Sequence, residues 1–546
     1  MPLTITINRS ANKLMQTRLL SLFALLATCS GYALEQPYPA APPGERLTPP
    51  IEETPSINGA NVFGATPGNP ILIKIPVSGK KPVSFSAKQL PEGLVLDQNK
   101  GIISGIVKKR GNYPIRVEAS NAKGKATKTI TLSVGDEICL TPPMAWNSWY
   151  SYSVAVSQER ILNVARMIVD TGLADHGWSY VNIDDCWQGD RNSPDKSLQS
   201  NPETFPDMKA MCDEIHSLGL KAGIYSSPWI STYAGFRGGS MPNRGGDYSK
   251  LAIPENQRMN VYQIFGKWPG LHQNKADHAG EFCMMDVDAR QWAKWGFDYV
   301  KMDWLPNDVP TTKKIHDLLK KSGRDIVLSL SNAAPFENME GLAQYANLTR
   351  TTGDIHDSWR SVSGIGFGQE KWQQFTKPGH WPDPDMLQVG KIGVPNEKNT
   401  TFKPSRLTPD EQMTQVSLWC LISAPLIISS DLTNLDDFTL GLLTNDDMIA
   451  INQDRAGNPA KRPLDRDGLQ VWTKELSNGR TAVGFFNMKD EKAVYEVDIN
   501  KDLKIAGKTN IRDLWRRKNI GSAPAKFSVE LNPHGSAVFL FTSSSR

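Results

Sequence analysis

Residues 297–305 read FDYVKMDWL, a short and mostly apolar run with a charged residue, Asp303, near its end. The run is rich in β-forming residues and too short for a stable helix, which favours a buried strand. Seven further runs of this kind occur between Met144 and Asp454. The eight predicted strands are 144–149, 180–185, 221–227, 297–305, 326–332, 348–354, 380–387 and 426–432.

The segments between these strands carry helical periodicity. After Ser157, a suitable N-cap, apolar residues such as Ile161, Val164 and Ile168 recur every three to four positions. Eight strands that alternate with helices predict a (β/α)₈ TIM barrel over residues 140–455. Further helices are predicted at 206–218, 287–295, 312–321, 408–422 and 437–451.

Two β-rich segments flank the predicted barrel. Residues 55–135 alternate short β-forming runs with turn residues and predict a small β-sandwich, and residues 90–105 resemble the Ig-like modules attached to exported bacterial enzymes. Such a module is expected to act as a spacer, with sugar binding as the alternative. Residues 458–546 predict a C-terminal antiparallel β-sandwich. The expected fold is therefore a multidomain α/β and β protein.

The first 33 residues have the features of a signal peptide. Residues 19–28 form an apolar run behind Lys13 and Arg18, too short for a membrane span of about 20 residues, and small residues precede a cleavage site after Ala33. We expect a periplasmic or secreted protein without a membrane span. Lipid attachment at Cys29 is the disfavoured rival, because Thr28 fits a lipobox poorly. Residues 34–54 contain six prolines and predict an extended linker.

Composition and net charge argue against several classes of partner and cofactor. The chain has 546 residues and a formal net charge of only +4, which argues against nucleic acid or an anionic membrane as the main partner. Five scattered cysteines follow the leader, an odd number that gives no disulfide framework. No CxxC, HxH or HExxH motif occurs, so neither a metal nor another cofactor is expected.

Carboxylates at the ends of predicted strands point to the chemistry. Asp184 and Asp185 end one strand, Asp303 and Asp354 end two others, and Asp385 lies in a fourth. Burying a charge is costly, and a barrel gathers the carboxyl ends of its strands at one face. Two carboxylates with different roles are what cleavage of a glycosidic bond requires. The pattern therefore predicts a glycosidase.

Neighbouring residues fit this chemistry. Lys301 lies two positions before Asp303, on the same side of the strand, and is expected to lower the pKa of that carboxyl and keep it ionised. Arg350 lies four positions before Asp354 and can reach the same pocket. Aromatic rings at strand ends can stack on a sugar, although each is more often core packing. The candidates are Trp149, Trp187, Tyr225 and Trp304.

Several motifs resemble those of glycoside hydrolase family 27, the α-galactosidase family, over about 140–546. The motifs are PPMAW (142–146), NIDDCW (182–187), YVKMD (299–303), DIHDSW (354–359), WPDPDML (381–387), APL (424–426) and AINQD (450–454). The resemblance implies a retaining hydrolase in which Asp303 is the nucleophile and Asp354 the acid/base. It implies substrate contacts by Trp149, Asp184, Asp185, Tyr225, Lys301, Ser331, Arg350 and Asp385.

The sequence also departs from the family pattern. Leu305 stands where animal members have a bridged cysteine, and the insertion 228–286 is absent from compact members. Ser331 and Ala334 stand where α-galactosidases carry a Glu and a Leu near the sugar's 2-hydroxyl, which resembles the family's α-N-acetylgalactosaminidases. The intervening Asn332-Ala333 matches neither branch.

An α-galactosidase is the expected activity, and α-N-acetylgalactosaminidase is the first alternative. Isomaltodextranase and β-L-arabinopyranosidase activities also occur in the family. A non-catalytic carbohydrate-binding protein is a remote alternative, because mere binding needs no acid and nucleophile pair, and a metal-dependent barrel hydrolase is more remote still. The natural glycan and the oligomeric state stay open.

Overall fold

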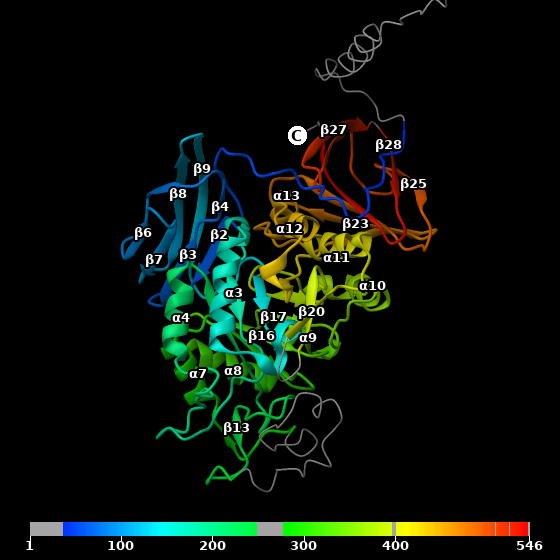
Figure 1. The fold of residues 1–546 in the computed structure, drawn as a ribbon. Helices are drawn as coiled ribbons and strands as arrows, with labels where there is room; N and C mark the ends of the chain where they lie inside the picture. The colour runs from blue at the N-terminus through cyan, green and yellow to red at the C-terminus, as the bar shows by residue number, and fades with distance from the viewer. Residues whose placement is uncertain (1–35, 248–276, 396–399, 508, 524, 544–546) are drawn as a thin grey trace, which may run out of the picture.

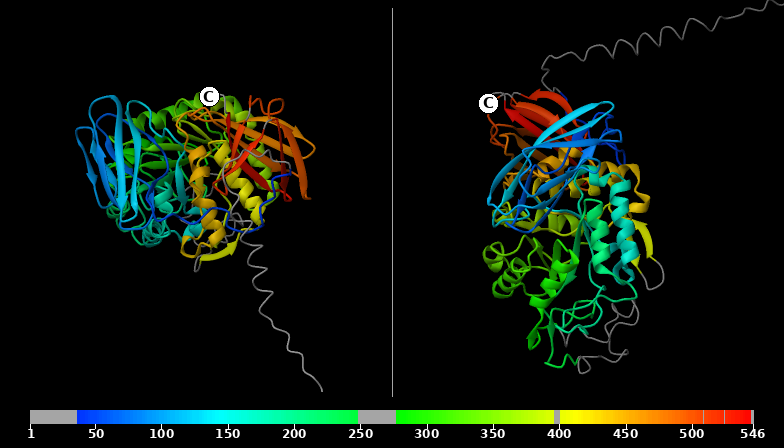
Figure 2. Two further views of the ribbon diagram at one scale, coloured as in Figure 1. Left: turned by 90° about the horizontal axis from the view of Figure 1, so that it is seen from above. Right: turned by 90° about the vertical axis from the view of Figure 1, so that its left-hand side faces the viewer.

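A central barrel carries two β-domains at one of its ends (Figure 1). The computed structural model describes residues 36–247, 277–395, 400–507, 509–523 and 525–543. Seen from above, the N-terminal Ig-like module and the C-terminal domain lie over opposite sides of the barrel (Figure 2). The predicted fold class is confirmed.

All eight predicted barrel strands are present and parallel. In chain order they are β10 (Met144–Asn147), β11 (Tyr180–Asn182), β12 (Lys221–Ser226), β15 (Tyr299–Asp303), β16 (Val327–Ser331), β17 (Leu348–Arg350), β18 (Trp381–Asp383) and β21 (Leu426–Ile428). The sheet runs β18-β17-β16-β15-β12-β11-β10-β21, and a parallel bridge between Leu387 and Ile428 closes the ring. The interior is filled by a layer that includes Tyr180, Tyr299 and Leu348.

Helices cover the outside of the barrel. Ser157 caps the first long helix by accepting a hydrogen bond from the amide of Arg160, as expected. The prediction of one helix over 437–451 was wrong. Asn445 interrupts it, because its side chain accepts hydrogen bonds from the amides of Asp447 and Met448 and so begins a new helix. The helices are α3 (Gln158–Asp170), α4 (Met208–Ser217), α7 (Met285–Trp295), α8 (Val309–Lys320), α10 (Trp359–Phe367), α11 (Pro409–Leu421), α12 (Asp437–Leu443) and α13 (Asp446–Asn452).

The Ig-like module is a sandwich of two sheets around a small apolar core. One sheet consists of β2 (Val62–Ala65), β9 (Gly124–Val134), β8 (Gly111–Asn121) and β5 (Ser84–Lys88), and the other of β3 (Pro70–Lys74), β7 (Ile102–Ile106) and β6 (Leu94–Asp97). The module is docked on the barrel. The Asp325 carboxylate accepts hydrogen bonds from Thr66 N and Asn69 Nδ2, both at 2.8 Å.

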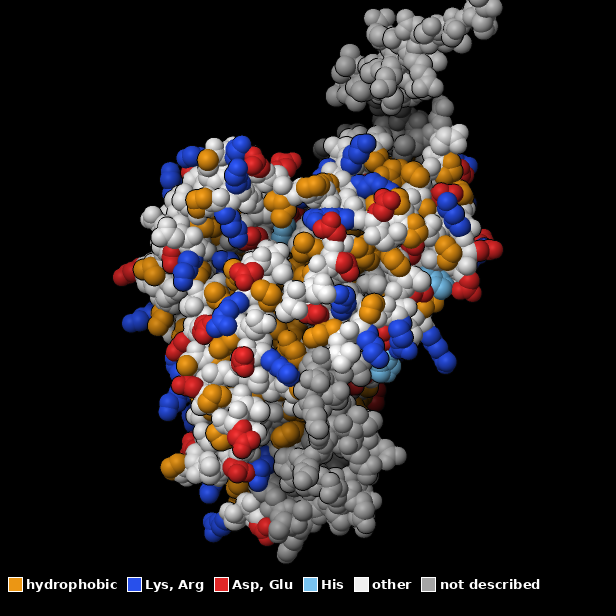
Figure 3. Space-filling model, viewed as in Figure 1, with side chains coloured by type: hydrophobic (Ala, Val, Ile, Leu, Met, Phe, Trp, Pro, Cys, Tyr) orange, Lys and Arg blue, Asp and Glu red, His pale blue; other side chains and the backbone are white. Residues whose placement is uncertain are grey.

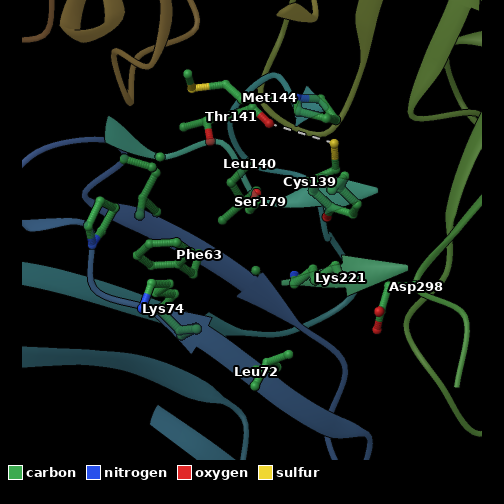
Figure 4. Close-up of a pocket in the computed structure, with 18 of the residues that line it drawn as sticks. Phe63, Leu72, Lys74, Cys139, Leu140, Thr141, Met144, Ser179, Lys221 and Asp298 are labelled. Carbon is green, nitrogen blue, oxygen red and sulfur yellow. Dashed lines mark hydrogen bonds between the residues drawn. The ribbon is translucent and has the colours of Figure 1, made fainter. Parts of the chain in front are cut away.

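A pocket of about 140 Å³ lies in this seam, lined by residues of both domains that include Phe63, Lys74, Lys221 and Asp298 (Figure 4). The barrel loops that meet the module precede β11, β12 and β16. The contacts therefore lie at the amino ends of the strands, away from the strand-end carboxylates.

The C-terminal domain packs on the barrel through α11, which is buried along almost its whole length. Its larger sheet consists of β22 (Lys461–Arg466), β23 (Leu469–Glu475), β24 (Thr481–Asn487), β29 (Ser536–Ser543), β26 (Thr509–Asp513) and β27 (Lys518–Ala523), and its smaller one of β25 (Ala493–Asp498) and β28 (Lys526–Leu531). Lys474, 1% exposed, donates to Ser423 Oγ at 2.5 Å across this interface.

The proline-rich residues 36–54, here called the strap, are extended but not free. Tyr38 pairs with Val529 of β28, and its hydroxyl donates to Asp513 Oδ2 at 2.7 Å. Further along, the buried Thr48 hydroxyl donates to Gly441 O at 2.7 Å and accepts from Asn445 Nδ2 at 3.0 Å. The strap thus crosses from the C-terminal domain over α12 and α13 to the Ig-like module.

Deletion of residues 34–135 should lower the melting temperature by roughly 5 °C or more, because it removes the strap and the docked module. The kcat and KM on small aryl glycosides should stay near wild type, since the module contacts the amino ends of the barrel strands and the strap contacts α12, α13 and the C-terminal domain. Calorimetry and steady-state kinetics test the two statements. A large fall in kcat in a folded truncated protein would show that the module helps to build the active site.

The distribution of charged side chains on the surface agrees with the small net charge of the chain. Over the described part of the face in Figure 3, Lys and Arg side chains are interspersed with Asp and Glu. Of the helices in the described ranges, none combines the length and the apolar character that crossing a bilayer demands.

Candidate active site

The carboxyl ends of the barrel strands form the site, at the end of the barrel from which the β13 hairpin extends in Figure 1. This hairpin, β13 (Ser240–Met241) with β14 (Phe282–Cys283), belongs to the insertion 228–286, of which 248–276 lie outside the described residues. The hydrogen-bonded clusters here contain every predicted site residue: Trp149, Asp184, Asp185, Tyr225, Lys301, Asp303, Ser331, Arg350, Asp354 and Asp385.

Asp303 is the last residue of β15 and is only 6% exposed. The Tyr225 hydroxyl donates to its Oδ2 at 3.0 Å, and Asn332 Nδ2 donates to its Oδ1 at 2.7 Å. Burial raises the pKa of Asp303 to about 6, although Lys301 and the Tyr225 hydrogen bond lower it. The carboxylate is thus held on both oxygens, and its pKa lies above its ordinary value.

Lys301 lowers the pKa of Asp303, as the sequence predicted, but it forms its ion pair elsewhere. Its ammonium lies 2.8 Å from Asp184 Oδ2, so its ion pair is with Asp184 and not with Asp303. Asn147 Nδ2 donates to the same oxygen at 2.9 Å. The predicted lowering of the Asp303 pKa by Lys301 is present, but burial outweighs it, so the net pKa of Asp303 is raised.

Asp185 is held by the insertion and by its neighbour in the chain. Its Oδ2 accepts from the amide of Ala234 at 3.1 Å, its Oδ1 accepts from the amide of Cys186 at 2.8 Å, and the Thr232 side chain also hydrogen-bonds to it. Burial raises the pKa of Asp185 to about 7. Residues 232–234 of the insertion therefore fix the carboxylate of Asp185.

Arg350 joins the remaining carboxylates. Its guanidinium lies 3.0 Å from Asp354 Oδ1 and 2.9 Å from Asp385 Oδ2, and 3.5 Å from Ser331 Oγ. Asp385 is buried and is held by the amide of Ile355 at 2.9 Å. The arginine thereby fixes the acids of two adjacent strands, while about half of the Asp354 side chain stays open to solvent.

A nucleophile should have a low pKa and a general acid a raised one. In the free protein the pKa values of Asp303 and Asp354 are shifted the other way. Burial raises the pKa of Asp354, but Arg350 and Lys301 outweigh it and hold that pKa below its ordinary value. The pKa of Asp303 is raised. Sugar binding would remove water from the half-exposed Asp354, and desolvation favours the protonated acid. The roles therefore have to be tested separately.

The four strand-end aromatic residues fall into two groups. Trp149 is half-buried at the start of α2 (Trp149–Tyr152), and the Tyr225 hydroxyl faces Asp303. Trp187 and Trp304 are 0% and 2% exposed and pack in the barrel core. Trp187 Nε1 donates to the carbonyl of Tyr225 at 2.9 Å, so it supports the site from behind.

Sequence reasoning missed three polar residues of the site. Asn147 and Asn332 hydrogen-bond the acids directly, and the Tyr150 hydroxyl donates to the carbonyl of Ile355 beside Asp354 at 2.7 Å. Asn332 ends the predicted strand 326–332 and Asn147 lies within the predicted strand 144–149, which was an available signal. Tyr150 carried none.

Disulfides and metal sites were the other features that the sequence analysis considered. The described cysteines 139, 186, 212, 283 and 420 are all free thiols, and Leu305 is 43% exposed. Among the described residues, no group of three or more His, Cys, Asp or Glu is arranged to hold a metal ion.

Family profiles cover most of the chain. The profile described as Alpha galactosidase A matches residues 141–253 and 257–454, and the Alpha galactosidase C-terminal beta sandwich domain matches 466–541. An Ig-domain profile matches 54–135.

Individual proteins agree with the profiles. "Alpha-galactosidase 2" of Arabidopsis thaliana is 30% identical over 74% of this chain and 90% of its own length. "Alpha-galactosidase A" of Cellvibrio japonicus is 30% identical over 74% and 92%.

Solved structures share the fold. A Bacteroides fragilis protein, provisionally described as an α-galactosidase, is 30% identical with a TM-score of 0.77, over 90% of this chain and 98% of its own. A β-L-arabinopyranosidase from Geobacillus stearothermophilus is 28% identical with a TM-score of 0.61, over 74% and 97%. The chain belongs to the α-galactosidase family, glycoside hydrolase family 27.

Proposed function

We propose that the protein is an exported, retaining α-galactosidase that removes terminal α-linked galactose by double displacement. The observation that carries this proposal is the separate support of two carboxylates: Tyr225 and Asn332 hold Asp303, while Arg350 holds Asp354. Export rests on the signal-peptide features of residues 1–33.

In the first step, a carboxylate oxygen of Asp303 attacks C1 of the galactose and forms a glycosyl ester. Asp354, protonated in the complex, gives its proton to the departing glycosidic oxygen. In the second step, Asp354 removes a proton from water, and that water displaces Asp303 from C1. The two inversions return the sugar with its original α configuration.

Asp184 and Asp185 account for the choice of sugar. Their buried carboxylates can accept hydrogen bonds from the axial 4-hydroxyl and the 6-hydroxyl of galactose, and the ion pair with Lys301 holds Asp184 in place. An α-glucoside, whose 4-hydroxyl is equatorial, leaves a buried acid without its partner, which a polar site rejects by large factors.

An α-N-acetylgalactosaminidase is the second candidate, because Ser331 and Ala334 are small. Ser331 is 1% exposed with its Oγ toward Arg350, and the amide of Ala334 donates to the carbonyl of Arg350 at 3.0 Å. The two residues thus lie where β16 meets β17, next to Asp354. Family membership favours galactose over its N-acetyl analogue.

The wild type should show a higher kcat/KM on p-nitrophenyl α-galactoside than on the matching N-acetylgalactosaminide. Ser331→Glu should widen that ratio by roughly tenfold, because a larger side chain fills space beside Arg350. Ser331→Ala keeps the space open and serves as the control. A wild type that prefers the N-acetyl substrate would overturn the main proposal, and an unchanged ratio in Ser331→Glu would show that Ser331 does not face C2.

A further inference from the structure

Asn332 directly follows β16 and reaches the carboxylate of Asp303. Its Nδ2 lies 2.7 Å from Oδ1, while the Tyr225 hydroxyl lies 3.0 Å from Oδ2. Each oxygen of the carboxylate thus has its own donor from a different strand end. A donor so close to the attacking group lies within reach of atoms bonded to the reacting carbon.

The backbone fixes this amide in place. Asn332 has a φ of 70°, in the left-handed region that Asn tolerates better than most residues. The next two amides are tied to the end of β17: Ala333 N donates to Thr352 O, and Ala334 N donates to Arg350 O, both at 3.0 Å. The loop therefore holds Asn332 between the strand of Asp303 and the loop that leads to Asp354.

The order of strands decides which part of the sugar lies over Asn332. On the proposed function, Asp184 and Asp185 after β11 hold the hydroxyls of C4 and C6, and Asp303 at the end of β15 lies beneath C1. In the sheet, β16 and β17 continue on the side of β15 that is remote from β11. C2, the ring carbon next to C1 and remote from C6, therefore lies over the loop after β16.

The chemistry of the amide suits a 2-hydroxyl. One N–H is used on Asp303, and in the described part of the chain no group donates to the Asn332 Oδ1. A hydroxyl both donates and accepts, so it can meet the amide in either sense. Attack on C1 also neutralises the Asp303 carboxylate, which weakens the existing hydrogen bond and frees the amide for the sugar.

We propose that Asn332 is a specificity-determining residue of this enzyme: its amide bridges Asp303 and the 2-hydroxyl of the galactose. The inference rests on the proposed function and deepens it. It adds Asn332 to Ser331 and Ala334 as a residue that selects the substituent at C2, and Asn332 matches neither the galactosidase nor the N-acetylgalactosaminidase pattern.

The test removes the side chain and the hydroxyl in turn. Asn332→Gly keeps the left-handed backbone available, and kcat/KM is measured on an aryl α-galactoside and on its 2-deoxy counterpart. The ratio of the two values should fall roughly tenfold in the variant, the ordinary worth of one well-placed hydrogen bond. The intrinsic reactivity of the 2-deoxy compound cancels, because both enzymes meet the same pair of substrates.

Asn338→Ala is the matched control. Asn338 belongs to the same loop, and its Nδ2 donates to the backbone carbonyl of Asn307 at 2.9 Å, so its loss disturbs the loop without touching the acids. Its substrate ratio should equal that of wild type. An Asn332→Gly ratio equal to that of wild type, in an enzyme that does cleave α-galactosides, overturns this inference alone. A wild type without activity on α-galactosides overturns the proposed function as well.

Discussion

Asp303→Asn is expected to lower kcat on aryl α-galactosides by roughly four to six orders of magnitude, because an amide cannot form the glycosyl ester. Substrate binding should persist, since Asp184 and Asp185 are untouched. Steady-state and single-turnover kinetics measure the loss. Substantial turnover in a preparation free of wild type would remove Asp303 from the role of nucleophile.

The same change should stabilise the fold at neutral pH. Burial raises the pKa of Asp303 to about 6, above the ordinary value of 3.8, so the folded state binds its proton more tightly than the unfolded state. That contribution is complete below about pH 3.8 and is lost as the pH rises through 6, which costs the wild type on the order of 3 kcal/mol at neutral pH. Asp303→Asn removes the ionisation. Its advantage in denaturant melts should be largest above pH 6 and small at pH 4, and an advantage independent of pH would contradict this account.

Asp354→Ala should slow hydrolysis of galactosides with poor leaving groups by roughly 10³-fold or more, because their oxygen needs a proton. A dinitrophenyl galactoside, whose leaving group needs none, should still form the glycosyl ester, which then accumulates because no base activates water. A burst of dinitrophenol followed by slow turnover is the expected trace.

Azide can show which of Asp303 and Asp354 is the nucleophile, a question that the pKa values of the free protein leave open. In Asp354→Ala, azide can replace water in the second step and should give the α-galactosyl azide, since two inversions occur. If Asp354 were instead the nucleophile, azide would attack C1 directly in this variant and give the β-galactosyl azide. Proton NMR of the product distinguishes the anomers, and the β product would reverse the assignment.

The barrel and its carboxylates could be predicted because both follow from local rules. A strand-end acid is read directly from the sequence, and a parallel barrel gathers such ends on one face. The partner of Lys301 could not be predicted in this way. Asp303 is nearer along the chain, but the ammonium pairs with Asp184 of another strand, and that choice depends on burial and side-chain reach.

Other differences between the predicted and the observed structure also arise from side-chain contacts that the sequence pattern does not report. Asn445 broke the predicted helix because a side chain competed with the helical backbone, which apolar periodicity does not report. Asn332 gained its place from a left-handed backbone, and two hydrogen bonds from the residues after it, to the end of β17 and to the loop beyond, hold that backbone. Proline content predicted an extended segment at 34–54 but could not show that Tyr38 and Thr48 dock.

The course of the strap matters for anything attached in front of it. Tyr38 lies on β28, at the far end of the molecule from the β13 hairpin and the carboxyl ends of the barrel strands (Figure 1). A bead, resin or cell surface that carries the protein through residues ahead of the strap would therefore leave the barrel mouth turned outward. Immobilisation by this end should keep large, branched galactosides within reach of the enzyme.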